Sequence, residues 1–296
     1  MTTQPPPPPA HAWPAAPDPP ELPAGVVAST GRPAWPPLSA IIAIVAALGA
    51  ALGGGLVIAI VGVAFGADVE DPPPSITILS TVVQNACFVG AVLIFARMRA
   101  PVAPWQLGLR GTRIGPAIGW ILLAFVVLVA FSVAWNAIIG QDEPQNLPEE
   151  LGVDSSAWAL GFSALLVTVV APIGEEVLFR GYVFPALRNW KGLWPAVVLT
   201  GVLFGLLHVL GSPAYALLPL AIFGSLLCLL YYKTKSLYPC IALHSINNSI
   251  AFGGSPEVGW DWQILPLGLS ALAVIALAAF AVRRRFGAPP AGLVPV

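Results

Sequence analysis

Long apolar stretches, separated by short polar or proline-rich gaps, dominate this chain. A helix needs about 20 mostly apolar residues to cross the hydrocarbon of a bilayer. Eight stretches reach or approach that length, and the fifth and seventh are the short ones. They cover residues 39–66, 75–96, 114–140, 156–178, 193–210, 213–232, 236–253 and 262–282. The pattern predicts an all-α fold, a polytopic transmembrane helical bundle of about eight spans.

The composition agrees with this prediction. Apolar residues make up 57% of the 296 positions and charged residues 9%, whereas soluble domains carry about 25% charged residues. A chain this poor in charge cannot cover its surface against water, so the lipid bilayer must be one of its partners. The net charge of −1 argues against nucleic acid as another. The three cysteines lie in apolar runs without the spacing of a zinc site or disulfide framework, and are expected to act as packing residues.

The two ends differ from the apolar middle. Residues 1–36 contain the proline run 5–9 and few large aliphatic residues, a composition that predicts a disordered, Pro-rich tail. No signal peptide is visible, because the first apolar run follows this tail without a basic region before it. We therefore expect a transmembrane bundle over residues 37–286 and a short tail over 287–296.

Positive charge alternates along the chain and predicts its orientation. From the first span onward, every Lys or Arg lies in a gap that follows an even-numbered span, and the charged residues of the other gaps are all acids. The basic residues are Arg97, Arg99, Arg110, Arg113, Arg188, Lys191, Lys233, Lys235 and Arg283 to Arg285. The positive-inside rule places these gaps in the cytoplasm. The chain is thus expected to be a multi-pass protein of the cell membrane with both termini cytoplasmic.

Ionisable residues inside the apolar runs are expensive and mark functional sites by default. The fourth run contains the adjacent carboxylates Glu175 and Glu176, followed by Arg180. Arg180 lies four residues after Glu176, on the same helix face, so the two can pair. Glu175 points about 100° away and lacks that partner. The two carboxyl groups should then differ in proton affinity, which makes Glu175 the candidate base. Pro172 is expected to kink this helix and free backbone carbonyls.

Two further polar groups lie in later runs. His208 follows Phe204 by four residues in the fifth run, and His244 and Asn248 share a helix face in the seventh. Each group alone has a structural explanation, such as an ion pair between helices or an interhelical hydrogen bond. Together they exceed what packing requires, which favours a single functional site.

Peptide hydrolysis in a bilayer needs an activated water and a donor to the developing oxyanion. A glutamate and a histidine can deprotonate the water, and a histidine with an asparagine amide can stabilise the oxyanion. Alternatively, Glu175, His208 and His244 could bind zinc with a position left for water. A zinc mechanism and a metal-free glutamate mechanism both stay open. The chain has no HExxH, GxGD or GxSG sequence, which argues against zincin, aspartyl and rhomboid-type sites.

The order EExxxR, FxxxH and HxxxN on successive spans resembles the CPBP family, the type II CAAX prenyl endopeptidases and bacteriocin-processing enzymes. The resemblance covers residues 155–253. It implies an eight-span intramembrane endopeptidase acting on a peptide or protein substrate at the membrane. By this resemblance Glu175 and His208 activate the water, His244 and Asn248 stabilise the oxyanion, Arg180 holds Glu176, and Phe204 lines the site.

Two other classes of function compete with proteolysis. A proton- or cation-coupled transporter would use the intramembrane carboxylates as a relay, but its polar residues should occupy pseudo-symmetric halves. A non-catalytic scaffold or immunity protein would not need the complete polar cluster. The depth of the residues poses a separate question, since straight spans place Glu175 late in the fourth and His208 about 15 residues into the fifth, about 22 Å deeper. We expect the fourth helix to begin nearer Phe162, or the fifth to begin in the cytoplasm; failing both, the polar residues do not form one site.

Overall fold

The computed structural model describes residues 35–70, 72–98, 101–140, 151–153, 156–255, 258–259 and 262–287. Within these residues the chain forms helices and loops and no strand, which confirms the predicted all-α class. The predicted tails, residues 1–36 and 287–296, lie almost entirely outside the described residues. Their expected disorder and cytoplasmic location stay predictions.

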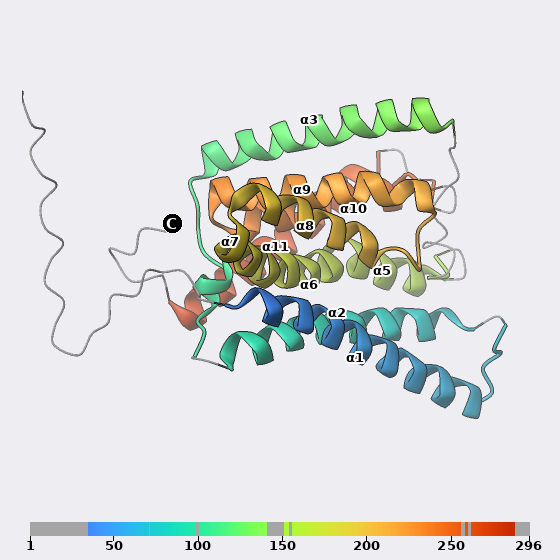
Figure 1. Ribbon diagram of the computed structural model, residues 1–296. Helices are drawn as coiled ribbons and strands as arrows, with labels where there is room; N and C mark the ends of the chain where they lie inside the picture. The colour runs from blue at the N-terminus through green and yellow to red at the C-terminus, as the bar shows by residue number, and fades with distance from the viewer. Residues whose placement is uncertain are drawn as a thin grey trace, which may run out of the picture. The chain divides into compact units, whose positions relative to one another are not determined.

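In the described part of the chain, seven single helices and one composite helix form the bundle (Figure 1). The single helices are α1 (Pro37–Ala64), α2 (Pro74–Arg97), α3 (Ile114–Ile139), α8 (Leu193–Leu207), α9 (Leu217–Thr234), α10 (Leu237–Gly253) and α11 (Ile264–Phe286). Six helices of the described residues are long and apolar enough to cross a membrane. α8 has 15 residues and α10 has 17, and these are the short fifth and seventh runs of the sequence. The chain is a multi-pass membrane protein.

The fourth span is a continuous helix of 35 residues, Ala157–Lys191. Its parts are α5 (Ala157–Leu165), the π turn η2 (Leu166–Val170), α6 (Ala171–Leu178), the π turn η3 (Phe179–Val183) and α7 (Phe184–Lys191). Each π turn ends two residues before a proline, Pro172 or Pro185. A proline ring clashes with the carbonyl four residues earlier and withholds an N–H, so the turn before it widens.

The predicted boundaries of this helix were wrong at its C-terminal end. The helix does not begin near Phe162, and it continues through Arg180 to Lys191 instead of ending near residue 178. Gly192, with a φ of 80°, then reverses the chain into α8. Glu176 and His208 are each 16 residues from Gly192. Because α7 and α8 run antiparallel from that turn, the two residues lie at the same level, which removes the expected difference in depth.

α6 lies in the middle of the bundle. The α1–α2 pair packs on one side of it, while α9 and α10 lie on the other side with α3 beyond them (Figure 1). Pro172 and all residues from Gly174 to Leu178 are buried. The two adjacent carboxylates of α6, Glu175 and Glu176, are thus buried inside the bundle.

Glycines bring α8 and α9 into close contact. A Cβ at Gly205 would come within 2.7 Å of Leu217 O, and one at Gly201 would overlap Ser225 Oγ. On the facing helix, a Cβ at Gly224 would lie 2.9 Å from the Cβ of Phe204. The small-residue spacing Gly201-x-x-x-Gly205 is typical of tightly packed membrane helices. It holds Phe204 against the centre of the bundle, where Phe204 is 1% exposed.

The segment between α2 and α3 contains the short helix η1 (Pro104–Leu107). It contacts the chain where α9 ends and α10 begins. The N–H of Leu237 donates to Gly108 O at 2.8 Å. Gly108 has a φ of 91°, and a Cβ there would lie 2.7 Å from the Tyr231 ring. Both the left-handed backbone and the close ring therefore favour glycine. This contact fixes the start of α10, the helix that carries His244.

Candidate active site

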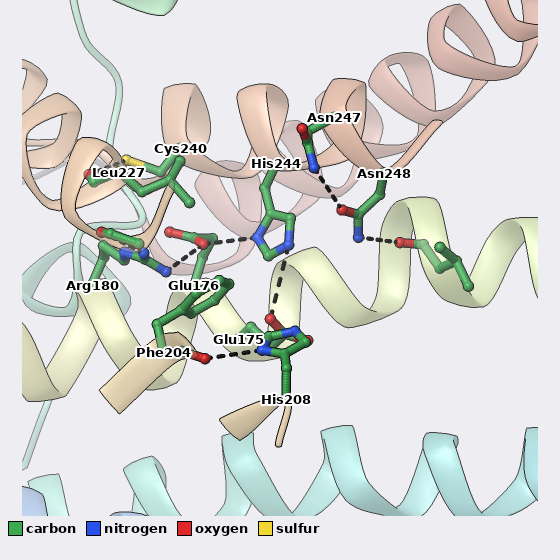
Figure 2. Close-up of polar contacts among 12 residues, drawn as sticks. Glu175, Glu176, Arg180, Phe204, His208, Leu227, Cys240, His244, Asn247 and Asn248 are labelled. Atoms are coloured by element: carbon green, nitrogen blue, oxygen red, sulfur yellow. Dashed lines mark hydrogen bonds and ion pairs between the residues drawn. The ribbon is translucent and has the colours of Figure 1, made fainter. Parts of the chain in front are cut away.

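Polar side chains from the composite helix and α10 meet in the centre of the bundle, with the end of α8 beside them (Figure 2). α6 carries Glu175 and Glu176, η3 carries Arg180, and α10 carries His244. These four residues are 7%, 0%, 0% and 3% exposed, respectively. The structure thus brings four of the six predicted site residues into direct contact with one another.

Glu176 and Arg180 form a fully buried ion pair. Arg180 Nη1 donates to Glu176 Oε1 at 2.8 Å, which confirms the pairing expected from their spacing. Arg180 Nη2 donates to Gly224 O at 2.7 Å, and its guanidinium carbon lies 4.7 Å from the centroid of the Phe204 ring. Because a guanidinium holds several partners in fixed directions, Arg180 joins the composite helix to α8 and α9.

His244 links the two carboxylates. Its Nδ1–H donates to Glu176 Oε1 at 2.9 Å, and its Nε2 lies 3.8 Å from Glu175 Oε2 (Figure 2). A carboxylate accepts, so the proton on this ring belongs to Nδ1 when the imidazole is neutral. Glu176 therefore orients His244 and aims Nε2 at Glu175. Glu175 Oε2 has no hydrogen-bond partner among the described residues.

His208 reaches this cluster through an aromatic contact. It follows the last residue of α8, and its Nδ1–H donates to Phe204 O at 2.9 Å. The Phe204 ring centroid lies 5.1 Å from that of His208 and 5.7 Å from that of His244. With Nδ1 bonded, the free nitrogen of His208 is Nε2. The side chain is half-buried, so His208 lies at the more open edge of the site.

Two side chains of α10 bond to backbone carbonyls that Pro172 leaves short of a donor. An N–H bonds to the carbonyl four residues earlier in an α-helix and five residues earlier in a π turn. Pro172 lacks this N–H, so one donor is missing for the pair of carbonyls Thr168 O and Val167 O. Ser245 Oγ donates to Thr168 O at 2.6 Å, and Asn248 Nδ2 to Val167 O at 3.0 Å. The expectation that Pro172 frees carbonyls near the site is confirmed.

Replacing Ser245 by alanine should therefore weaken the joint between α10 and the composite helix. Thr168 O would be left without its donor from α10, and we expect a loss of about 0.6–1.7 kcal/mol, the range for interhelical hydrogen bonds in membranes. Denaturation with SDS, followed by circular dichroism, measures this free energy of unfolding. Ser249→Ala is the matched control, because Ser249 is equally buried and donates only within α10, to Ser245 O. Equal stability of the two variants would contradict the assigned role.

The buried charges of the site can balance. Glu176 and Arg180 neutralise each other within their ion pair. Glu175 and His244 face each other beside this pair, with His244 Nε2 at 3.8 Å from Glu175 Oε2. Because an uncompensated charge is costly in a low-dielectric interior, the Arg180 guanidinium stabilises the carboxylate of Glu176.

The arrangement does not match the predicted zinc site. Zinc takes nitrogen and oxygen ligands at about 2.0–2.2 Å, so three ligands must converge on one point. In the part of the chain that the structure describes, no three His, Cys, Asp or Glu side chains are placed to hold one ion. Glu175, His208 and His244 therefore do not assemble as a metal-binding set, and the mechanism proposed below uses no metal.

Sequence reasoning missed some residues that support the site. Ser245 lies directly after His244 and could have been found from Pro172, since a proline inside a membrane helix requires a donor from elsewhere. Gly224 supplies its carbonyl to Arg180, and no sequence signal identifies a particular carbonyl. Asn248 and His244 share a face of α10, as their spacing predicts. The Asn248 amide, however, donates to Val167 O of η2 and not to His244.

Comparisons with known proteins agree with this site. The family model described as "Type II CAAX prenyl endopeptidase Rce1-like" matches residues 157–250, which include every residue named above for the site. Residues 157–250 are thus similar to the type II CAAX prenyl endopeptidases. This finding confirms the resemblance that the three motifs indicate, and it covers the composite helix, α8, α9 and most of α10.

Two curated proteins are each similar to part of this chain. The UPF0177 protein YxdF of Lactococcus lactis subsp. lactis (strain IL1403) is 33% identical over 90 residues, 30% of this chain. YdiL of Bacillus subtilis (strain 168), whose name marks it as a candidate membrane peptidase, is 26% identical over 169 residues, 55% of this chain. The matches span 47% and 66% of the lengths of these two proteins. No solved structure matches the chain.

Proposed function

We propose that this chain is an intramembrane endopeptidase of the CPBP type, which hydrolyses a peptide bond with a water molecule activated at Glu175. The proposal rests on the chain of contacts from Glu175 through His244 to Glu176 and Arg180, buried within a membrane bundle. This arrangement joins a carboxylate oxygen without a partner to an imidazole that a second carboxylate holds in place. The match to endopeptidases over residues 157–250 supports the same reaction class.

A water molecule placed beside Glu175 and His244 can contact both groups. Their separation of 3.8 Å is too long for a direct hydrogen bond, and a water in contact with both groups satisfies them. In the proposed reaction Glu175 Oε2 takes a proton from this water as the water oxygen bonds to the carbonyl carbon of the substrate. His208 Nε2 accepts a hydrogen bond from the second O–H of the water and so orients the water molecule.

The negative charge that develops on the substrate oxygen needs donors. In the proposed mechanism His244, when protonated, donates from Nε2, while Glu176 and Arg180 keep the imidazolium in place. Asn248, which has one N–H on Val167 O, offers its second N–H. The carbon–nitrogen bond then breaks, and Glu175 passes the proton it took from the water to the leaving amine. The products are a carboxylic acid and an amine, and Glu175 is again a carboxylate.

The orientation of the site follows from the basic ends of the helices. Arg97 ends α2, Lys191 ends α7, and Lys233 lies in the last turn of α9. We propose that this end of the bundle faces the cytoplasm by the positive-inside rule, so that substrates are cut from the cytoplasmic side. Cysteine introduced at Lys191 should then react with an impermeant maleimide only in inside-out vesicles; reaction in right-side-out vesicles would reverse the orientation.

The function is tested with the full chain in proteoliposomes. A farnesylated peptide with a C-terminal Cys-aliphatic-aliphatic-X sequence, the same peptide without the lipid, and a set of hydrophobic peptides serve as probes. Mass spectrometry in H₂¹⁸O should show one ¹⁸O atom in the new carboxyl group of a cleaved probe, because water is the nucleophile. A folded wild-type protein that cleaves none of the probes would count against the proposal.

Removal of metal ions should leave the reaction intact. The described residues hold no three-ligand set for one ion, and the proposed base and donors are side chains. Pre-incubation with EDTA and 1,10-phenanthroline is expected to change the cleavage rate less than about twofold. A zinc-dependent peptidase assayed in the same buffer serves as the control. A more than tenfold loss that added Zn²⁺ restores would show that the metal-free mechanism is wrong.

A further inference from the structure

Asn85 is a buried polar residue of α2, outside the matched residues 157–250. It is 3% exposed, and its Nδ2 donates to Thr81 O within the same helix at 2.9 Å. Its Oδ1 is buried and has no hydrogen-bond partner among the described residues. An unpaired acceptor inside a membrane bundle is unfavourable, and an apolar side chain would fill this position at lower cost. Packing alone therefore does not explain an asparagine here.

The side chain of Asn85 is pressed against the backbone immediately before Glu175. A Cβ built on Gly174 would overlap Asn85 Oδ1 and would lie 3.2 Å from Asn85 Cβ. Gly174 has no positive φ, so its backbone does not require glycine. Glycine is needed at 174 for space, to let the amide of Asn85 reach the surface of α6. A carbonyl oxygen this close to a glycine can accept a weak Cα–H hydrogen bond.

This contact lies on α6 directly beside Glu175, so a change there can rotate α6 and move the Glu175 side chain. Gly174 faces α2, Glu175 is rotated from it by about 100°, and Glu176 by about 200°. Arg180 and His244 both bond to Glu176. Glu175 Oε2 has no hydrogen-bond partner among the described residues and lies 3.8 Å from His244 Nε2. A rotation of α6 by about 10° would displace a group about 6 Å from the helix axis by about 1 Å. A misplacement of about 1 Å can cost about 10²-fold in rate.

We propose that Asn85 is a positioning residue that sets the rotation of α6 through Gly174 and so holds Glu175 at its distance from His244. The α1–α2 pair then contributes to the reaction although it carries no proposed catalytic group. This inference rests on the proposed peptidase function, because it concerns the placement of the proposed base.

The experiment is a double-mutant cycle on the full chain in proteoliposomes, with a probe peptide that the wild type cleaves. Gly174→Ala places a methyl group on Asn85 Oδ1 and is expected to lower kcat about 10²-fold, with KM changed less than threefold. Asn85→Ala removes the contact without an overlap and should lower kcat about tenfold. In the double variant the nearest contact becomes the Cβ of residue 85 at 3.2 Å. Its kcat should therefore return to the level of Asn85→Ala.

Two controls separate this outcome from general effects on α2 and α6. Gly161→Ala, on the same composite helix, adds a Cβ that meets nothing within 4 Å. Gln84→Ala removes the neighbouring amide on a different face of α2. Both should keep kcat within twofold of wild type. The thermal unfolding midpoint of every variant is measured alongside, and Asn85→Ala is expected to stay folded.

The outcomes distinguish this inference from the proposed function. If wild type cleaves and the effects of Gly174→Ala and Asn85→Ala multiply in the double variant, the two residues are not coupled and the inference is wrong. It is equally wrong if Asn85→Ala keeps the kcat of wild type, or if either variant changes KM alone. If folded wild type cleaves no probe, the proposed function itself fails. Recovery of kcat in the double variant, with both controls unaffected, establishes the positioning role.

Discussion

Replacing Glu175 by glutamine is expected to lower kcat about 10²–10⁴-fold, the range over which a general base contributes to catalysis. Glutamine has nearly the same shape, but its amide cannot take a proton from water. The fold should not change, because among the described residues Glu175 Oε2 has no hydrogen-bond partner and lies 3.8 Å from His244 Nε2. Steady-state kinetics with a probe peptide measures kcat, and the SDS unfolding curve reports the fold.

The matched control for this substitution is Glu70→Gln, the same change at an exposed position after α1. It should leave both kcat and stability at the wild-type level. The result that would contradict the mechanism is a Glu175→Gln protein with wild-type kcat, since another group would then have to take the proton. A loss of activity accompanied by unfolding would instead show that Glu175 has a structural role.

Replacing Arg180 by methionine should be the most destabilising single change in the chain. It leaves Glu176, which is 0% exposed, as a buried carboxylate without its cation. Breaking a buried pair from one side costs about 3–5 kcal/mol. Gly224 O also loses its donor. A loss of this size is comparable to the whole stability of many domains, so we expect little folded protein. The measurement is the free energy of unfolding in SDS, with folded yield as a second readout.

A compensating substitution separates two contributions to the loss of stability, the unpaired buried charge and the lost packing. The double variant Glu176→Gln and Arg180→Met carries neither charge and should recover much of the lost stability, because an uncharged pair needs no counter-ion. It should remain inactive, since His244 loses the carboxylate that orients it. Arg97→Met, at an exposed arginine that ends α2, is the control and should be neutral. Wild-type stability of the single Arg180→Met variant would show that the ion pair does not support the fold.

Local rules were sufficient for much of the fold and of the site. Apolar runs of span length predicted the helices, and two short runs correspond to the shorter helices α8 and α10. The four-residue spacing of Glu176 and Arg180 predicted their ion pair, because helix geometry alone brings such residues together. Pro172 predicted free carbonyls, since a missing N–H is a covalent property of the residue.

The continuation of the fourth helix beyond residue 178 could not be predicted in the same way. Arg180, Pro185 and Arg188 look like the start of a polar loop when hydropathy is read along the chain. Arg180 nevertheless remains in the bundle, because Glu176 neutralises it and Gly224 O accepts from it across 44 residues. The true end of the helix at Lys191 places His208 at the level of Glu176, and the predicted difference in depth disappears.

The sequence by itself identified the candidates for the chemistry: two carboxylates, an arginine, two histidines and an asparagine in apolar runs, where lipid makes polar side chains costly. Only the tertiary structure decided their connections. His244 lies between Glu175 and Glu176, Asn248 bonds to Val167 O, and Asn85 meets Gly174. The physical reason is separation along the chain. Helix periodicity relates residues three or four positions apart within one helix. These contacts join different helices, so they depend on how the helices rotate and approach each other.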